Sequence, residues 1–168
     1  RFETEFLPSE GEDGMDASGM DKVQFLMSAN VGEALKPIQK VASGGELARI
    51  MLALKNVLAE DDGIGSLVFD EVDTGVSGRA AQKVAEKMAD VARHKQVLCV
   101  THLPQIAARG CAHYKVYKQD NETETNSHIR RLTDDERVEE IAHMLSGAKL
   151  TEAALNNARA LLEVSNSK

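Results

Sequence analysis

Two kinds of hydrophobic pattern alternate along this chain, and together they predict an α/β fold. The short apolar runs at 66–70 and 96–100 are typical of strands that are buried on both faces of a parallel sheet. The segment between them carries apolar residues at helical spacing, so we expect a right-handed parallel crossover. Ligands of such sheets bind beyond the carboxyl ends of the strands, which directs attention to the residues that follow each run.

Helices are expected on both sides of the first run. Before it, helical spacing predicts one buried stripe of six residues: Leu47, Ile50, Met51, Leu54, Val57 and Leu58. Ser43 and Glu46 stand at capping-box spacing, which defines the start of this helix. After the run, a helix is expected from Ser77 or Gly78, and its inward positions are Ala81, Val84, Ala85, Met88 and Ala92.

Peripheral hairpins and further helices are expected elsewhere. The predicted strands are 1–7 and 22–28, joined by the long loop 8–19, and 113–119 and 125–132 around a turn at 120–122. The segment 30–40 is expected to be irregular, because it contains Gly32 and Pro37. The predicted helices are 103–109, 151–164 and one from Thr133 to Gly147 that buries Val138, Ile141, Ala142 and Leu145.

Composition limits the classes of function that fit. With 168 residues, 42% of them apolar, the chain suits one globular domain over residues 1–168. No apolar run approaches the roughly 20 residues of a membrane span, so no membrane partner is expected. The net charge of −7 leaves no electrostatic footprint for nucleic acid, so DNA contact would need another part of the protein. The two cysteines, Cys99 and Cys111, make no disulfide framework and favour a reducing cytoplasm.

The first candidate for chemistry is the acidic pair Asp70-Glu71 at the end of the first apolar run. Two unpaired carboxylates are costly to desolvate unless a cation or a shared proton offsets their charge. The pair therefore predicts a phosphate-bound Mg²⁺, with Asp70 as its ligand, directly or through water. Glu71 would then polarise an attacking water as general base. The alternative interpretation is two solvated acids at a strand end.

The second candidate is Ser43-Gly44-Gly45-Glu46 at the start of a predicted helix. Free backbone N–H groups and the positive end of the helix dipole favour an anion at such a position. The two glycines let the anion approach the backbone, and the Ser43 hydroxyl adds a donor. The alternative interpretation is a capped helix after a glycine turn.

Two further segments border the acidic pair. Residues 72–77 form a polar turn directly after it, which would otherwise be an ordinary loop with an N-cap serine. Thr101-His102 ends the second run, which places His102 at the same crevice, within reach of a phosphate or of the water. A hydrogen-bonded structural histidine is the alternative there. Zinc on Cys99 and His102 is not expected, because strand alternation aims these side chains at opposite faces.

In this order and spacing, the segments resemble the C-terminal half of an ABC-type (P-loop NTPase) ATPase head. Residues 42–46 look like the signature motif, 67–70 like Walker B followed by the catalytic base, Asp73 like the D-loop and His102 like the switch histidine. The resemblance narrows to the RecN family of bacterial SMC-like DNA double-strand-break repair proteins. The sequences that carry it are 25–30, 35–38, 41–55, 69–78, 100–107 and 141–147. The resemblance covers nearly the whole chain and is most specific over 41–107.

The resemblance implies a role for each site residue. In that family, ATP is sandwiched between two heads, so each site joins the Walker motifs of one subunit to the signature helix of the other. Asp70 would order Mg²⁺, Glu71 would activate water and His102 would contact the γ-phosphate. Nucleotide contacts are likewise implied for Ser43, Gly44, Gly45 and Glu46, toward the partner's ATP, and for Asp73 at the dimer interface.

Cofactors and partners also follow from the resemblance. The implied cofactors are ATP and Mg²⁺. The implied partners are the N-terminal Walker A half of the same head, a second head in a homodimer, and DNA through other parts of the protein. The implied location is the bacterial cytoplasm, at the nucleoid.

Two departures from the family pattern matter. The signature begins with Ala42 where ABC transporters usually carry Leu, which leaves the phosphate-facing residues Ser43 and Gly45 unchanged. More importantly, no Gly is followed by Lys, so the chain holds no Walker A loop of the form Gly-x-x-x-x-Gly-Lys-Ser/Thr. With no initiator Met at Arg1, we expect a fragment that is inactive until a Walker A half completes it.

Two alternatives stay open from the sequence. The chain would also suit the C-terminal lobe of another SMC-type, Rad50-type or ABC ATPase. From a different class, it would suit a non-catalytic structural or interaction lobe. A Walker A motif and long heptad repeats upstream of Arg1 would separate these readings.

Overall fold

The computed structural model describes residues 1–9, 14–15, 17, 19–28, 32–41, 43–58, 63–120, 125–147 and 149–166. They form two compact units, Arg1–Leu47 and Ala48–Lys168, which are considered one at a time below. The prediction of a single domain over 1–168 stays a prediction. Much of the 8–19 loop and most of the turn expected at 120–122 lie outside the described residues.

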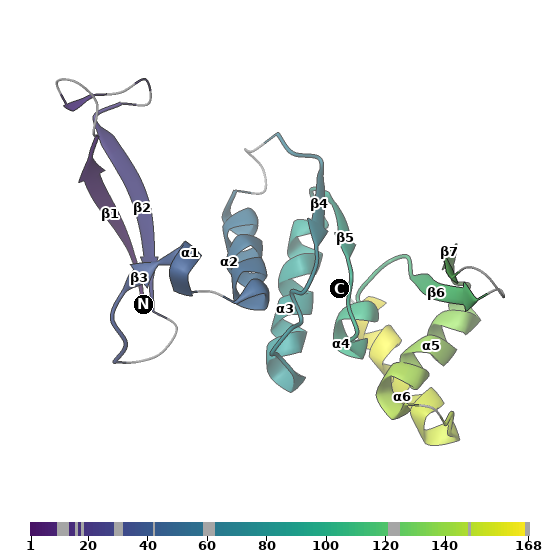
Figure 1. Ribbon diagram of the computed structural model, residues 1–168. Helices are drawn as coiled ribbons and strands as arrows, with labels where there is room; N and C mark the ends of the chain where they lie inside the picture. Colours follow the sequence, from purple (N-terminus) through teal and green to yellow (C-terminus); the bar gives the residue numbers. More distant parts are fainter. Residues whose placement is uncertain are drawn as a thin grey trace. The chain divides into compact units, whose positions relative to one another are not determined.

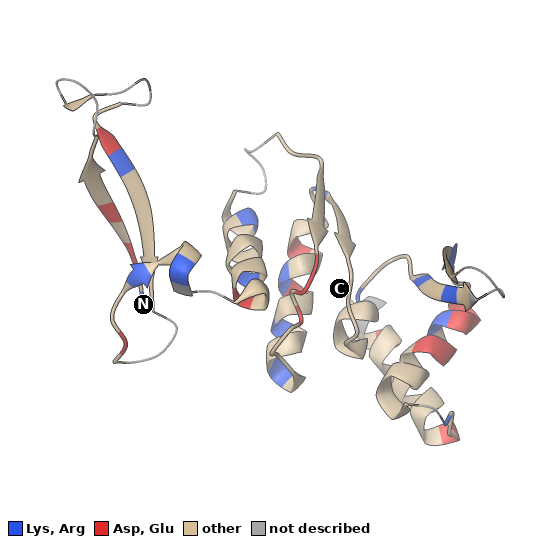
Figure 2. Ribbon diagram, in the orientation of Figure 1, with Lys and Arg blue, Asp and Glu red and all other residues tan. Residues whose placement is uncertain are grey.

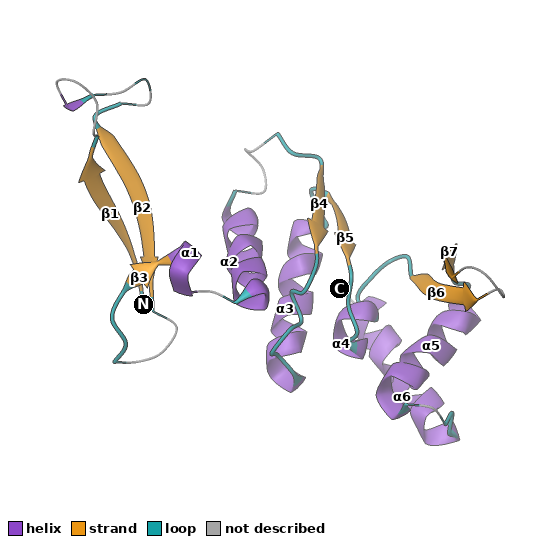
Figure 3. Cartoon of the chain, in the orientation of Figure 1, coloured by secondary structure: helices purple, strands orange, loops and turns teal. Residues whose placement is uncertain are grey.

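The first unit is built on an antiparallel hairpin (Figure 3). Strand β1 (Phe2–Pro8) pairs with β2 (Asp21–Met27), in a register that runs from Phe2 opposite Met27 to Pro8 opposite Asp21. The predicted hairpin is therefore confirmed. The expectation of an irregular segment at 30–40 is wrong for its second half, where β3 (Lys36–Pro37) joins β2 and α1 (Ile38–Val41) follows. Pro37 is tolerated because β3 lies at the edge of this sheet.

The centre of the second unit is a pair of parallel strands linked by a helix (Figure 1). Strand β4 (Ser66–Phe69) pairs in parallel with β5 (Gln96–Cys99), and α3 (Gly78–Val91) connects them. The predicted order of strand, helix and strand is confirmed. The prediction that both strands are buried on both faces is wrong, because Val68, Leu98 and Val100 are 70%, 49% and 63% exposed. An apolar run of four residues looks the same whether one face or two is covered.

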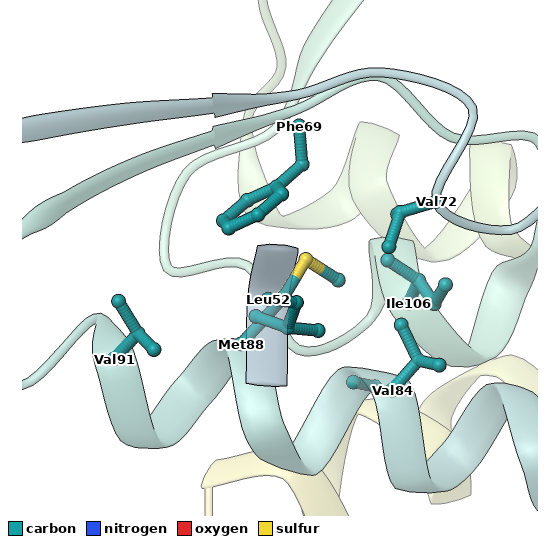
Figure 4. Close-up of a cluster of buried hydrophobic side chains, with 8 residues drawn as sticks. Leu52, Phe69, Val72, Val84, Met88, Val91 and Ile106 are labelled. Atoms are coloured by element: carbon teal, nitrogen blue, oxygen red, sulfur yellow. The ribbon is translucent and has the colours of Figure 1, made fainter. Parts of the chain in front are cut away.

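A compact apolar core lies against the other face of this strand pair (Figure 4). It joins β4, α3, α4 (Pro104–Ala107) and the helix over 44–57, and Val97 and Cys99 of β5 pack against it. Its buried side chains are Leu52, Phe69, Val72, Val84, Ala85, Met88, Val91 and Ile106. Burial of side chains of this size stabilises a fold by about 1.5–3 kcal/mol each. The α3 prediction is right except at its end, where Val91 rather than Ala92 faces the core.

Helix α2 (Gly44–Val57) presents a different face to the core from the one predicted. Leu52 is 3% exposed and packs in the core with Ala48, whereas Leu47, Met51, Val57 and Leu58 of the predicted stripe are between 40% and 82% exposed. The Asn56 side-chain amide donates to the Lys87 carbonyl oxygen at 3.0 Å, which ties this face of α2 to α3. The helix carries apolar residues on two sides, so periodicity alone could not identify the inner one.

The C-terminal part of the second unit is a hairpin beside two helices. Strands β6 (Tyr114–Asp120) and β7 (Thr125–Arg131) pair antiparallel, as predicted. Helices α5 (Asp134–Ser146) and α6 (Glu152–Asn166) bury a second cluster made of Ala108, Ile141, Ala142, Ala154 and Ala158. Leu145, predicted to face inward, is 41% exposed.

Local features fix the ends of α5. Thr133 and Glu136 form the predicted capping box, and the positive φ of Gly147 ends the helix. Ion pairs from Lys115 to Glu140 and from Arg130 to Glu136 hold the basic hairpin on the acidic side of this helix (Figure 2). Over the described ranges, none of the helices has the length and hydropathy needed to cross a membrane.

Candidate functional site

Two exposed carboxylates follow β4 directly, in the acidic stretch visible beyond this strand in Figure 2. The chain leaves the strand after Phe69, whose ring is buried in the core. Asp70 and Glu71 are then both exposed, and the Asp70 carboxylate accepts a hydrogen bond from the Glu71 amide at 2.9 Å. The strand end therefore presents two carboxyl groups to solvent on a backbone that the core holds in place.

Glu71 has a left-handed backbone. Its φ of 57° is positive, and no other described residue except glycine has a positive φ. The cause lies in the next residue, because Val72 is completely buried and turns the chain back into the core. The Thr74 amide closes this turn on the Glu71 carbonyl oxygen at 3.0 Å. The core therefore holds Glu71 outward in a conformation that costs an ordinary residue about 1–2 kcal/mol.

Asp73 is buried and binds the segment that follows β5. Its side chain is 3% exposed, and one oxygen, Oδ2, lies near three donors. These are the Thr101 hydroxyl at 2.5 Å, the His102 amide at 2.9 Å and the His102 ring nitrogen Nδ1 at 3.0 Å. Burial opposes ionisation of this carboxyl, but the hydrogen bonds from Thr101 and the His102 amide outweigh it, so the Asp73 pKa is lowered.

The interface role that the family resemblance implies for Asp73 stays a prediction. Within this chain its carboxylate is enclosed and bound to Thr101 and His102. The two residues after β5 are thus joined to the turn after β4. The His102 side chain is 73% exposed, so its ring is bound on one side and open to solvent on the other.

Arg49 is a site residue that sequence reasoning missed. Its guanidinium donates to the carbonyl oxygens of Val72 at 3.2 Å and Thr74 at 2.7 Å. This side chain of α2 therefore holds the turn that carries Glu71 and Asp73. The sequence signal was weak, since an arginine inside an amphipathic helix ordinarily faces solvent.

The segment at the start of α2 has the predicted capping box. The Ser43 amide donates to a Glu46 carboxylate oxygen at 3.0 Å, and the Glu46 amide donates to the Ser43 hydroxyl oxygen at 3.4 Å. Ser43 and Gly44 are exposed, Gly45 is buried and Glu46 is half-buried. The Ser43 hydroxyl also donates to this Glu46 oxygen at 3.2 Å, so an anion at this helix start would depend on the remaining backbone N–H groups. Ala42 lies outside the described residues.

The acidic pair fits a magnesium ion that is shared with a phosphate. Mg²⁺ in nucleotide sites takes one or two carboxylates from the protein and completes its shell with phosphate oxygens and water. Asp70 and Glu71 offer exposed carboxylate oxygens of this kind. In the parts of the chain that the structure describes, no three His, Cys, Asp or Glu residues group into a metal cage. The donor set thus suits an ion delivered with a nucleotide rather than one held by the protein alone.

Comparison with known proteins gives close relatives over nearly the whole chain. The DNA repair protein RecN of Halalkalibacterium halodurans is 46% identical over 167 residues, which is 99% of this chain and 30% of that relative. RecN of Deinococcus radiodurans is 56% identical over 146 residues, or 87% of this chain and 25% of the relative. The chain thus spans less than a third of the length of these relatives. No protein-family model matches it.

Solved structures with the same fold are SMC heads. The Smc head domain with a coiled coil and joint from Pyrococcus yayanosii gives a TM-score of 0.55 at 20% identity, over 98% of this chain and 26% of that one. A structure from work on ATP-driven dimerization and DNA-stimulated activation of SMC ATPases gives 0.54 at 16% identity, over 88% and 84% of the two chains. The predicted α/β fold of an ATPase head is confirmed. Matched along the C-terminal part of RecN proteins from several bacteria, this chain belongs to the RecN family.

Proposed function

We propose that this chain is the C-terminal lobe of an ATP-hydrolysing head that acts in bacterial DNA double-strand-break repair and recombination. The observation that carries the proposal is the arrangement after two parallel strands: an exposed acidic pair follows β4, and an exposed histidine follows β5. Crevices at the carboxyl ends of parallel strands are where α/β proteins bind nucleotides. The names of the relatives, DNA repair protein RecN, support the biological role.

The residues of the strand ends divide the work. Asp70 would hold the Mg²⁺ of the nucleotide, directly or through water, and that ion would supply charge neutralisation at the transferred phosphate. Glu71 would accept a proton from the attacking water. Its side chain is exposed, on a backbone with positive φ, and so is accessible to that water. His102 would contact the γ-phosphate through its exposed ring edge.

The start of α2 would serve a second nucleotide. Ser43 and Gly45 would bind the γ-phosphate of ATP held by a partner head, with backbone N–H groups as the main donors. Gly44 and Glu46 would complete the nucleotide contact at this helix start. The proposed assembly is a homodimer of heads, each completed by its own Walker A half, with DNA bound by other parts of the protein. It would work in the cytoplasm, at the nucleoid. The SMC neighbour described for ATP-driven dimerization and DNA-stimulated activation supports this arrangement by its fold.

The test uses the full-length protein with Glu71→Gln. This change keeps size and hydrogen bonding but removes the base, so we expect ATP binding and head association to persist while turnover falls by about 100-fold or more. Nucleotide binding, sedimentation with ATP and steady-state ATP hydrolysis measure the three properties separately.

Asp90→Asn is the matched control, because Asp90 is an acid on the surface of α3 whose partner is Lys87. Its turnover should equal that of the wild type. Wild-type turnover in Glu71→Gln would remove Glu71 from the role of base. Absence of ATP binding and of hydrolysis in the wild-type full-length protein would favour a non-catalytic lobe instead.

A further inference from the structure

We propose that Asp73 is a positioning residue for His102: it holds the Nδ1 edge of the imidazole, so that the ring presents Nε2 outward in a fixed orientation. The inference deepens the proposed function and rests on it for the consequence in catalysis. It is separate from the interface role that the family resemblance implies for Asp73, which stays a prediction. The bond itself is a property of this chain and can be tested without hydrolysis.

The first support is that the carboxylate is enclosed and has a fixed set of donors. Asp73 is 3% exposed, and Thr101 and His102 both bind its Oδ2 atom. An ionised carboxylate only accepts hydrogen bonds, so the ring nitrogen that faces it must carry the proton. With Nδ1 protonated, the neutral ring has its free lone pair on Nε2.

The second support is that the same carboxylate also fixes the backbone beneath the ring. The His102 amide donates to Oδ2 at 2.9 Å, so ring and main chain are held at one point. The Thr101 hydroxyl donates to Oδ2 and accepts from the Leu103 amide at 3.1 Å, which links the carboxylate to the next residue as well. The fully buried Val72 anchors Asp73 from the other side.

The consequence concerns what the exposed edge of His102 can do. In the neutral ring, Nε2 accepts a hydrogen bond or a proton from a water. In the protonated ring, Nε2–H donates to an anionic oxygen of a phosphate. Both roles require one fixed orientation of the ring, which free rotation about the His102 side-chain bonds would not provide. If Asp73 only stabilised the segment after β5, its hydrogen bond from the His102 amide would be sufficient and the contact with the ring would have no role.

The direct test is the tautomer of His102 in this chain. It is read from the ¹⁵N NMR signals of the two ring nitrogens at a pH where the ring is neutral. His102→Gln assigns the signals. We expect the Nδ1–H form in the wild type. In Asp73→Ala, no acceptor faces Nδ1, so we expect the Nε2–H form to become the major one. The same tautomer in wild type and Asp73→Ala would overturn the proposal.

Hydrolysis by the full-length protein tests the consequence. We expect Asp73→Ala to lower kcat by about tenfold or more with KM nearly unchanged, since the loss is one of orientation. If Asp73 acts through the ring, Asp73→Ala added to His102→Gln should lower kcat no further than His102→Gln alone. Multiplicative losses in the double variant would contradict this.

Variants at Thr101 keep the proposal testable if Asp73→Ala fails to fold. Thr101→Val removes the hydroxyl donor and should loosen the ring, whereas Thr101→Ser keeps the donor and should restore both the tautomer and kcat. Loss of kcat in both variants alike would count against the proposal. Failure of the proposed function would appear separately, as wild-type turnover in Glu71→Gln, and would leave the NMR result standing.

Discussion

At the scale of single residues, Glu71, the proposed base, is held in a conformation that lowers local stability. Its left-handed φ is imposed by the burial of Val72 on one side and the end of β4 on the other. Residues held in this region by their surroundings cluster at functional sites. The strain therefore supports the assignment of Glu71 as the base independently of the sequence motif.

The strain predicts a gain in stability when the side chain is removed entirely. Glycine adopts a positive φ without a steric penalty, so Glu71→Gly should raise the free energy of unfolding by about 1 kcal/mol. Glu71→Ala, which keeps the Cβ atom, is the control and should show little gain. Urea unfolding of the two variants measures the difference. Equal stability of the Gly and Ala variants would show that Glu71 is not strained.

The two cysteines should differ in reactivity. Burial raises the pKa of the Cys99 thiol to about 11, with smaller contributions from Asp73 and Asp70, whereas Cys111 is exposed. The thiolate is the reactive form and its fraction rises as pH approaches the pKa, so Cys99 stays protonated at pH 8. We expect iodoacetamide to label Cys111 at least about tenfold faster than Cys99. Equal rates, read from peptide masses, would contradict this placement of Cys99.

At the scale of elements, local signals were predictable and packing partners were not. The capping boxes at Ser43 and Thr133 involve residues three apart, so the sequence was sufficient to find them. The inner face of α2 depends on which neighbouring elements cover it: Leu52 is buried, whereas the predicted Met51 is exposed. The short strand β3 forms only because β2 offers an edge, which no pattern within 30–40 reveals.

The contact from α2 to the turn after β4 should be worth measurable stability. Arg49→Gln removes a charged donor from two carbonyl oxygens, so we expect a loss of about 1–2 kcal/mol in the free energy of unfolding. Arg49→Lys should recover only part of it, because an ammonium cannot copy the fork of a guanidinium. Arg79→Gln, an exposed change on α3, is the control. Arg49→Gln as stable as Arg79→Gln would mean that the contact contributes nothing.

At the scale of the molecule, the positions of the site residues were predictable to different degrees. Asp70, Glu71 and His102 could be placed at neighbouring strand ends, because parallel strands end at one edge of a sheet. The enclosure of Asp73 could not, since it depends on a side-chain contact with Thr101 across 28 residues. The exposed apolar face of β4 and β5 was also unpredictable, because the exposure of a strand face depends on which other elements cover it.

The chain contains no Walker A motif, and this has a direct consequence for hydrolysis. The chain supplies an acidic pair, a histidine and a signature-like helix start, but no Gly-Lys step to cradle phosphates. Hydrolysis should therefore need a second segment of the same protein. Each half should be inactive alone, and the mixture should depend on Glu71.

The most direct measurement is ATP hydrolysis by this chain, first alone and then mixed with the segment that carries the Walker A motif, with the Glu71→Gln chain as the control mixture. We predict no ATP turnover by the chain alone, turnover when the two segments are mixed, and no turnover in the mixture with Glu71→Gln. Turnover by the chain alone, or turnover in the Glu71→Gln mixture, would contradict the proposed function.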